Sequence, residues 1–136
     1  MGRGGSRVAV HHSKVADYRT VAESFCNGAE VAAEFGYWNA AAILQVHAAI
    51  ALADAIAIKL SGVRSRGENH YETITLLDEV VAPGQDKEKA LRQLRAIIDQ
   101  KNWVSYSGKI FSRRDVDKLA KLLDRFRNWA LKILTD

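Results

Sequence analysis

Three side chains suited to phosphate chemistry lie close together after the most apolar segment of the chain. Arg64 and Arg66 precede His70, and five residues separate Arg64 from His70. Arginine offers a planar fork of N–H donors to a phosphate, and histidine can donate or accept a proton near neutral pH. A helix starting at His70 would add free backbone N–H groups that favour an anion. These residues predict an anion-binding site and hold the minimum parts for RNA cleavage; alternatively, they are solvated side chains of an exposed loop.

A second candidate site lies at residues 101–106, where Lys101, Asn102, Trp103 and Tyr106 cluster. A cation, an amide and two aromatic rings suit a nucleotide or an unpaired RNA base, because bases stack on aromatic side chains. The alternative is structural: Trp103 and Tyr106 close the open end of the fold, and Asn102 caps the preceding helix.

The elements that must position these residues are all expected to be helices. Apolar side chains recur at three- and four-residue steps, which predicts helices over residues 13–34, 70–81 and 86–101, the last with Asp86 as N-cap. Ser112 followed by Asp115 forms a capping box that starts a final helix. Residues 102–111 lack helical periodicity and are expected to form an ordered connection.

Residues 37–60 are almost wholly apolar and predict a central helix with neighbours on most sides, ended by Ser61-Gly62. A membrane span is not expected, because Asp54 and Lys59 would each cost about 2.5–3.5 kcal/mol in a bilayer. His47 and Asp54 share one face of this helix but lie roughly 10 Å apart along its axis, so we expect each to have its own partner. The fold class predicted is all-α, an antiparallel up-and-down bundle of four to five helices.

Composition indicates one domain of 136 residues with a net charge of +4. We expect a flexible tail over residues 1–12 and a helical bundle over residues 13–136. The charge permits an anionic partner without requiring one. A single cysteine, Cys26, cannot form an internal disulfide, which favours a cytoplasmic location. No Cys/His set has the spacing of a metal site and no glycine-rich phosphate loop follows a strand, so we expect neither a metal nor a cofactor.

The order of these elements resembles the HEPN superfamily of helical bundles. The resemblance covers residues 13–134. It rests on an Ala-rich second helix that contains Gln45 and His47 and on a histidine that opens the third helix. The motif Lys-Asn-x-x-x-Tyr then precedes the last helix, which contains Phe126 and Trp129.

That resemblance implies a four- or five-helix bundle, often a homodimer, encoded beside a minimal nucleotidyltransferase in prokaryotic toxin–antitoxin or defence systems. Active members are metal-independent endoribonucleases, with an Arg followed a few residues later by a His, usually ahead of the final helix. In this chain that place holds Lys101-Asn102 with no histidine downstream, whereas the Arg64-to-His70 spacing occurs before the third helix. The chain therefore departs from the nuclease pattern.

We expect a binding module that engages RNA, a nucleotide or a nucleotidyltransferase partner through two groups of side chains. These are Arg64, Arg66 and His70, and Lys101, Asn102 and Tyr106. One alternative is a metal-independent endoribonuclease in which His70 is the acid or base and Arg64 or Arg66 stabilises the phosphorane. Another is a purely structural bundle that binds a protein partner.

Overall fold

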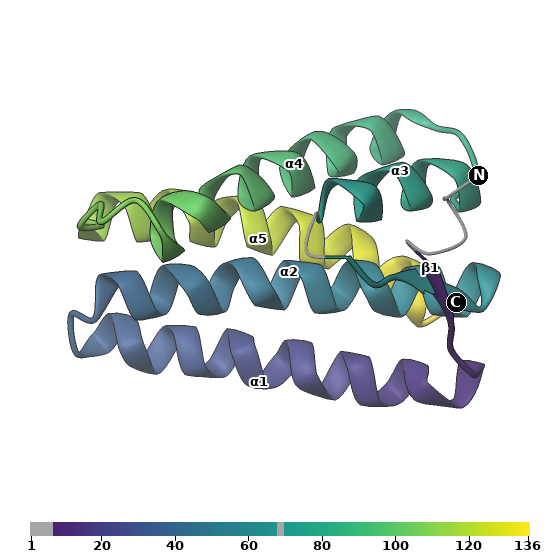
Figure 1. Cartoon of the computed structure of the whole chain (residues 1–136), viewed down its shortest axis with the longest axis horizontal. Coiled ribbons are helices and arrows are strands. Elements are labelled where there is room, and N and C mark those ends of the chain that lie inside the picture. The colour runs from purple at the N-terminus through teal and green to yellow at the C-terminus, as the bar shows by residue number, and fades with distance from the viewer. Residues whose placement is uncertain (1–6, 68–69) are drawn as a thin grey trace.

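The computed structural model describes residues 7–67 and 70–136, and these form a bundle of helices with one small sheet (Figure 1). The α-helices are α1 (Val15–Glu34), α2 (Trp38–Ser61), α3 (Tyr71–Val80), α4 (Gln85–Ser105) and α5 (Arg113–Leu134). A single turn of 3₁₀ helix, η2 (His12–Lys14), precedes α1, and the strands are β1 (Arg7–Ala9) and β2 (Val63–Ser65). The prediction of an all-α bundle is confirmed.

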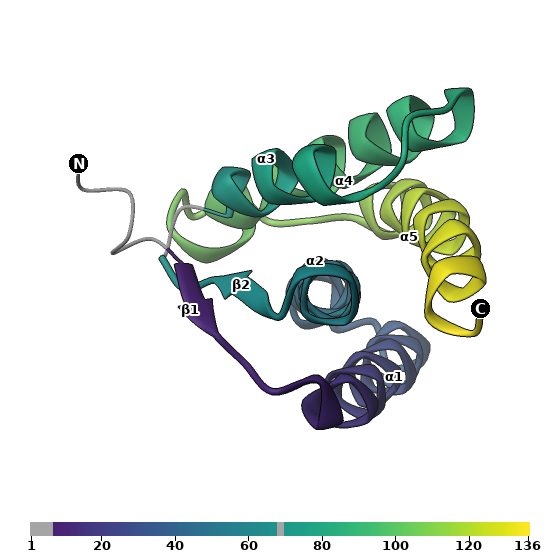
Figure 2. The ribbon, with the colours of Figure 1, turned by 90° about the vertical axis from the view of Figure 1, so that its right-hand side faces the viewer.

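Helix α2 is the centre of the bundle. Viewed along the bundle, α1, α5 and the α3/α4 pair surround α2, and the two strands lie on its remaining side (Figure 2). By length and composition α2 could cross a membrane, but 83% of its most apolar 18-residue window is buried in the protein. This is the pattern of a core helix in a soluble protein. Its many alanines let neighbouring helices approach its backbone closely.

The predicted helix boundaries at two positions are confirmed. Gly62 ends α2 in the left-handed region at φ 72°, and its N–H donates to the Ile58 carbonyl. Ser112 is the N-cap of α5: its hydroxyl accepts from the Asp115 N–H, while the Asp115 carboxylate accepts from the Ser112 N–H. Both groups of bonds satisfy backbone atoms that a helix end leaves unpaired.

Two side-chain contacts show that α5 runs in the same direction as α2. Near the start of both helices the Gln45 amide donates to the Val116 carbonyl at 3.3 Å, and near their ends Lys59 Nζ donates to the Ile133 carbonyl at 2.6 Å. Lys59 thereby satisfies a free carbonyl at the end of α5. Helix α3 also runs alongside α2 in this direction, because the chain turns back through β2 before α3 begins (Figure 1).

The strands correct two predictions. Arg7–Ala9 were expected in a flexible tail and Val63–Ser65 in a loop, but they pair as an antiparallel ribbon in which Val8 faces Arg64. Arg7 then reaches α3, where it forms ion pairs with Glu72 at 3.0 Å and with Glu79. Three-residue strands carry little periodicity, so the sequence offered no signal for this long-range pairing.

Helix α4 is longer than predicted. Residues 102–105, expected in the connection, continue α4, and Tyr106 is its C-cap, so Asn102 does not cap this helix. The connection that follows is ordered by Asn39 of α2, whose amide donates to the Lys109 carbonyl and accepts from the Phe111 N–H, both at 2.9 Å. Asn39 therefore holds the α4–α5 turn against the start of α2.

Candidate functional site

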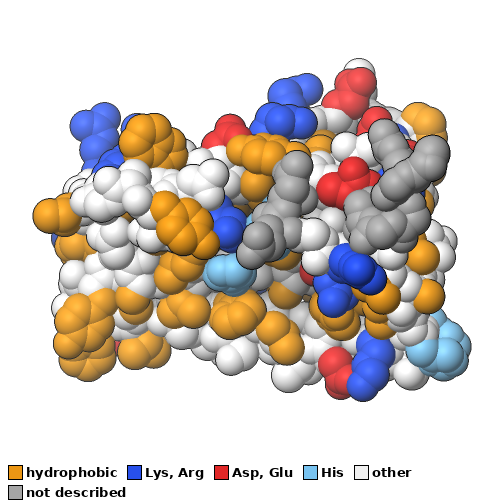
Figure 3. All heavy atoms as spheres, viewed as in Figure 1, with side chains coloured by type: hydrophobic (Ala, Val, Ile, Leu, Met, Phe, Trp, Pro, Cys, Tyr) orange, Lys and Arg blue, Asp and Glu red, His pale blue; other side chains and the backbone are white. Residues whose placement is uncertain are grey.

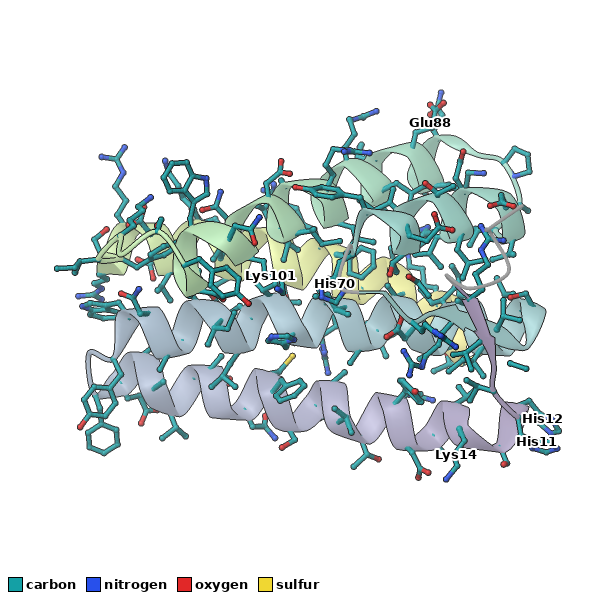
Figure 4. All side chains as sticks on the ribbon, in the orientation of Figure 1. His11, His12, Lys14, His70, Glu88 and Lys101 are labelled. Carbon is teal, nitrogen blue, oxygen red and sulfur yellow. The ribbon has the colours of Figure 1, made fainter. Side chains whose placement is uncertain are left out.

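Three polar side chains from three helical segments meet on one face of α2. The His47 ring, on α2, contacts the His70 ring at the start of α3 edge-on, with centroids 6.5 Å apart. Lys101, on α4, lies close enough to His47 for its positive charge to lower the pKa of the imidazole. In the view of Figure 4, Lys101 and His70 both lie between the α3/α4 pair and α2. We call His47, His70 and Lys101 the histidine–lysine cluster.

The cluster is open to solvent on one side. His47, His70 and Lys101 are all half-buried, and Phe25 of α1 lies against His47 with ring centroids 5.9 Å apart. In the space-filling view a histidine and an adjacent basic side chain reach the surface near the middle of this face, among hydrophobic side chains (Figure 3). The hydrophobic surroundings strengthen any electrostatic contact made there, because they exclude water.

The electrostatics of the cluster favour a neutral His47 beside a positive lysine. Burial lowers the pKa of His47, and the positive charge of Lys101 lowers it further. A neutral imidazole can accept a proton, and the ammonium group attracts an anion. The first turn of α3 adds backbone N–H groups, and its one acidic residue, Glu72, is engaged by Arg7. Together these groups can bind a phosphate.

Aromatic side chains extend the site along α4. The Lys101 ammonium lies over the Tyr106 ring, 5.4 Å from its centroid. Tyr106 is 76% exposed and Trp103 is 54% exposed. With Asn102 and Ser107 they line a shallow surface hollow of about 490 Å³. Exposed rings of this kind can stack on bases. Lys101 contacts the Tyr106 ring, whereas Trp103, two residues from Lys101 on α4, projects from nearly the opposite side of the helix.

Arg64 does not join the cluster. Its guanidinium donates to the Ser65 carbonyl at 2.9 Å and lies near Asp54, two turns along α2 from His47. Burial raises the pKa of Asp54 to about 7, although the charge of Arg64 acts in the opposite direction. Arg66 is exposed just after β2. The contacts that the structure does show place Arg64 near Asp54 and bring Lys101 close to His47, the ring neighbour of His70. The grouping of Arg64 and Arg66 with His70 stays a prediction.

His47 and Asp54 have different neighbours, but the expectation that each is satisfied by its own partner is not confirmed for Asp54, whose Oδ1 has no hydrogen-bond partner among the described residues. His47 contacts Phe25 and His70, whereas Asp54 lies near Arg64. Both nevertheless line one hollow of about 250 Å³ between α1 and α2. The groove on this face of α2 thus runs from Asp54, beside the small sheet, to the histidine–lysine cluster.

His47 is the site residue that sequence reasoning left out. It was assigned to a buried partner across the bundle, and its spacing from His70 and Lys101 along the chain is too large for any local motif. The available signal was a lone imidazole in an Ala-rich helix, since a buried polar group requires a partner.

Among residues 7–67 and 70–136, no group of three or more His, Cys, Asp or Glu side chains could hold a metal ion. Comparison of the chain with family models, with curated proteins and with solved structures gave no match.

Proposed function

We propose that this chain is a HEPN-like module that binds RNA through the histidine–lysine cluster and the adjacent aromatic hollow. The observation that carries the proposal is the convergence of His47, His70 and Lys101 from three helical segments on one open face. Exposed Trp103 and Tyr106 favour RNA over an isolated phosphate, because they offer stacking surfaces to unpaired bases. A nucleotide would use the same contacts.

Binding is tested with labelled single-stranded and structured RNA in EDTA, by gel shift at several salt concentrations. We expect Lys101→Ala to weaken RNA binding about 10-fold, since a hydrogen bond to a charged group contributes about 1.5–3 kcal/mol. The dependence of the binding constant on salt concentration should also fall by roughly one phosphate contact. Lys118→Ala, which removes the same charge from an exposed position on α5, is the matched control. Equal binding by both variants would remove Lys101 from the site.

A second candidate activity, metal-independent RNA cleavage, is favoured by the arrangement of the two imidazoles. Rings with centroids 6.5 Å apart can flank one phosphate. Neutral His47 would take the proton of the 2′-hydroxyl as its oxygen attacks phosphorus, and protonated His70 would donate a proton to the departing 5′-oxygen. A 2′,3′-cyclic phosphate and a 5′-hydroxyl would result, with Lys101 stabilising the phosphorane.

The same RNA samples distinguish the two activities. Cleavage in EDTA that yields cyclic phosphate ends and is lost in both His47→Ala and His70→Ala would establish the nuclease. A salt-sensitive shift without cleavage would support the binding module. Absence of both signals would favour the third alternative, a structural bundle that binds a protein.

The HEPN resemblance adds two proposals about partners. We propose that the protein forms a homodimer and that a minimal nucleotidyltransferase, in a prokaryotic toxin–antitoxin or defence system, is its partner. Light scattering of the purified protein measures the first, and co-purification with the product of an adjacent nucleotidyltransferase gene tests the second.

A further inference from the structure

A groove of about 590 Å³ lies between α4 and α5, and its volume is within the range of small-molecule sites. The start of α4 and the end of α5 form it, because the two helices run in opposite directions (Figure 1). In the view along the bundle, α4 and α5 lie next to one another on the side of α2 away from the β-strands (Figure 2). None of its lining residues belongs to the histidine–lysine cluster or to the aromatic hollow. The lining of this α4–α5 groove includes Asp86, Lys89 and Gln93 of α4 and Arg125, Trp129 and Lys132 of α5.

Three cations meet in the groove without an acidic partner. Lys89 comes from near the start of α4, whereas Arg125 and Lys132 lie two turns apart on one face of α5. None of the three forms an ion pair within the part of the chain that the structure describes. Asp86 is the one acid in the lining. The groove therefore carries a net positive charge and attracts an anion with more than one negative charge.

An aromatic ring lies between two of these cations. Trp129 is four residues from Arg125 and three from Lys132, so the three side chains share one face of α5. The indole is half-buried and contacts the fully buried Phe126 ring, with centroids 5.8 Å apart. Phe126 thus fixes the indole from the core side, and the open part of the indole offers a surface on which a planar ring can stack.

The remaining polar groups of the groove suit a base and a sugar. Gln93 of α4 and Asn128 of α5 present amides, which both donate and accept hydrogen bonds. The edge of a nucleobase carries donors and acceptors of the same kind. Asp86 presents a carboxylate, the group that accepts from ribose hydroxyls in many nucleotide sites.

We propose that the α4–α5 groove binds a nucleoside di- or triphosphate. Lys89, Arg125 and Lys132 contact the phosphate groups, because guanidinium and ammonium groups are the usual donors to phosphate. The base stacks on Trp129, and Asp86 accepts from a ribose hydroxyl. Inorganic phosphate would leave the indole uncovered, and a neutral aromatic molecule would leave the cations without an anion. Binding in this groove is independent of RNA binding at the histidine–lysine cluster.

The test is calorimetric titration of the full chain with ATP in EDTA, with adenosine and inorganic triphosphate as partial ligands. We expect saturable binding of ATP that is at least about 10-fold tighter than that of either partial ligand, since phosphate contacts and stacking both contribute. Arg125→Gln should weaken ATP binding about 10-fold by removing a charged donor. Lys118→Gln, which removes one charge from an exposed position of α5 outside the groove, is the matched control and should leave ATP binding unchanged.

The contribution of the indole is measured separately. Trp129→Leu should weaken ATP binding about 5-fold by removing the stacking surface, and Trp129→Phe, which keeps a ring, should recover most of the affinity. Circular dichroism checks that each variant is folded. If Trp129→Leu is not folded, the comparison of ATP with inorganic triphosphate on the wild type still measures the contribution of the nucleoside.

Four results would overturn the proposal. These are the absence of saturable binding at millimolar ATP, equal binding of ATP and inorganic triphosphate, equal binding of ATP and adenosine, and equal weakening by Arg125→Gln and Lys118→Gln. Lys101→Ala should bind ATP as the wild type does. Loss of ATP binding in Lys101→Ala but not in Arg125→Gln would place the nucleotide at the histidine–lysine cluster and refute a site in the groove. Failure of RNA binding would leave the expected ATP results unchanged.

Discussion

Replacing Asp54 with asparagine should make the protein more stable at alkaline pH. Asp54 is 8% exposed, its Oδ1 has no hydrogen-bond partner among the described residues, and burial raises its pKa from 3.8 to about 7. Between these two values the folded protein holds a proton that the unfolded chain has lost. The contribution of protonated Asp54 to the free energy of unfolding is therefore fully present below about pH 4 and is lost as the pH rises to about 7.

The size of the effect follows from the two pKa values. At 1.36 kcal/mol per pKa unit, a rise from 3.8 to about 7 corresponds to ~4 kcal/mol. Asparagine has the shape of the protonated acid and does not ionise. We expect Asp54→Asn to match the wild type near pH 4 and to exceed its free energy of unfolding by up to ~4 kcal/mol at pH 8.5.

The assay is urea unfolding of both proteins at intervals from pH 4 to pH 8.5. His47, whose folded pKa is lowered, gives stability that is lost as the pH falls, but it is present in both proteins and cancels in their difference. Asp124→Asn, on the exposed side of α5, controls for the loss of one charge. A difference between Asp54→Asn and wild type that stays constant with pH, or a less stable variant at pH 8.5, would refute the reasoning.

Two further predictions concern the core and a helix end. Phe126→Ala, at a fully buried position of α5, should lower the free energy of unfolding by about 3–5 kcal/mol in urea unfolding, because it removes a large side chain and leaves a cavity. If Phe126→Ala and the wild type unfold at the same urea concentration, Phe126 does not pack in the core as the structure shows. Ser112→Ala should cost ~1 kcal/mol by removing the acceptor for the Asp115 N–H, and Ser112→Thr, which keeps a hydroxyl, should recover most of it in the same assay.

Local signals were enough to predict that the helices exist and where two of them end or begin, but not the limits of α4, where Gly84 and not Asp86 is the N-cap. The apolar run of α2, the stop at Gly62 and the capping box at Ser112 each depend on neighbouring residues, and all three predictions are confirmed. The error at the end of α4 has a local cause: Trp103, Ser105 and Tyr106 are weak helix formers, but α4 continues to Ser105.

The candidate site was predicted only in part, because it depends on contacts between distant residues. His70 and Lys101 were selected by their chemistry, but His47 joins them only when α2, α3 and α4 pack together. Arg64 was grouped with His70 by proximity in the chain. Pairing of β2 with β1 fixes the backbone of Arg64, whose charge acts on Asp54, and neither strand could be recognised from its own three residues.

The β1–β2 ribbon also constrains the order in which the protein can assemble during synthesis. Arg7–Ala9 leave the ribosome before their partners, Val63–Ser65, which follow only after both α1 and α2 have been made. The α1–α2 hairpin can form first from contacts close in sequence, whereas the ribbon must wait for loop closure across more than fifty residues, from Ala9 to Val63. An N-terminal fusion that hinders this late step should slow maturation while leaving the helices intact.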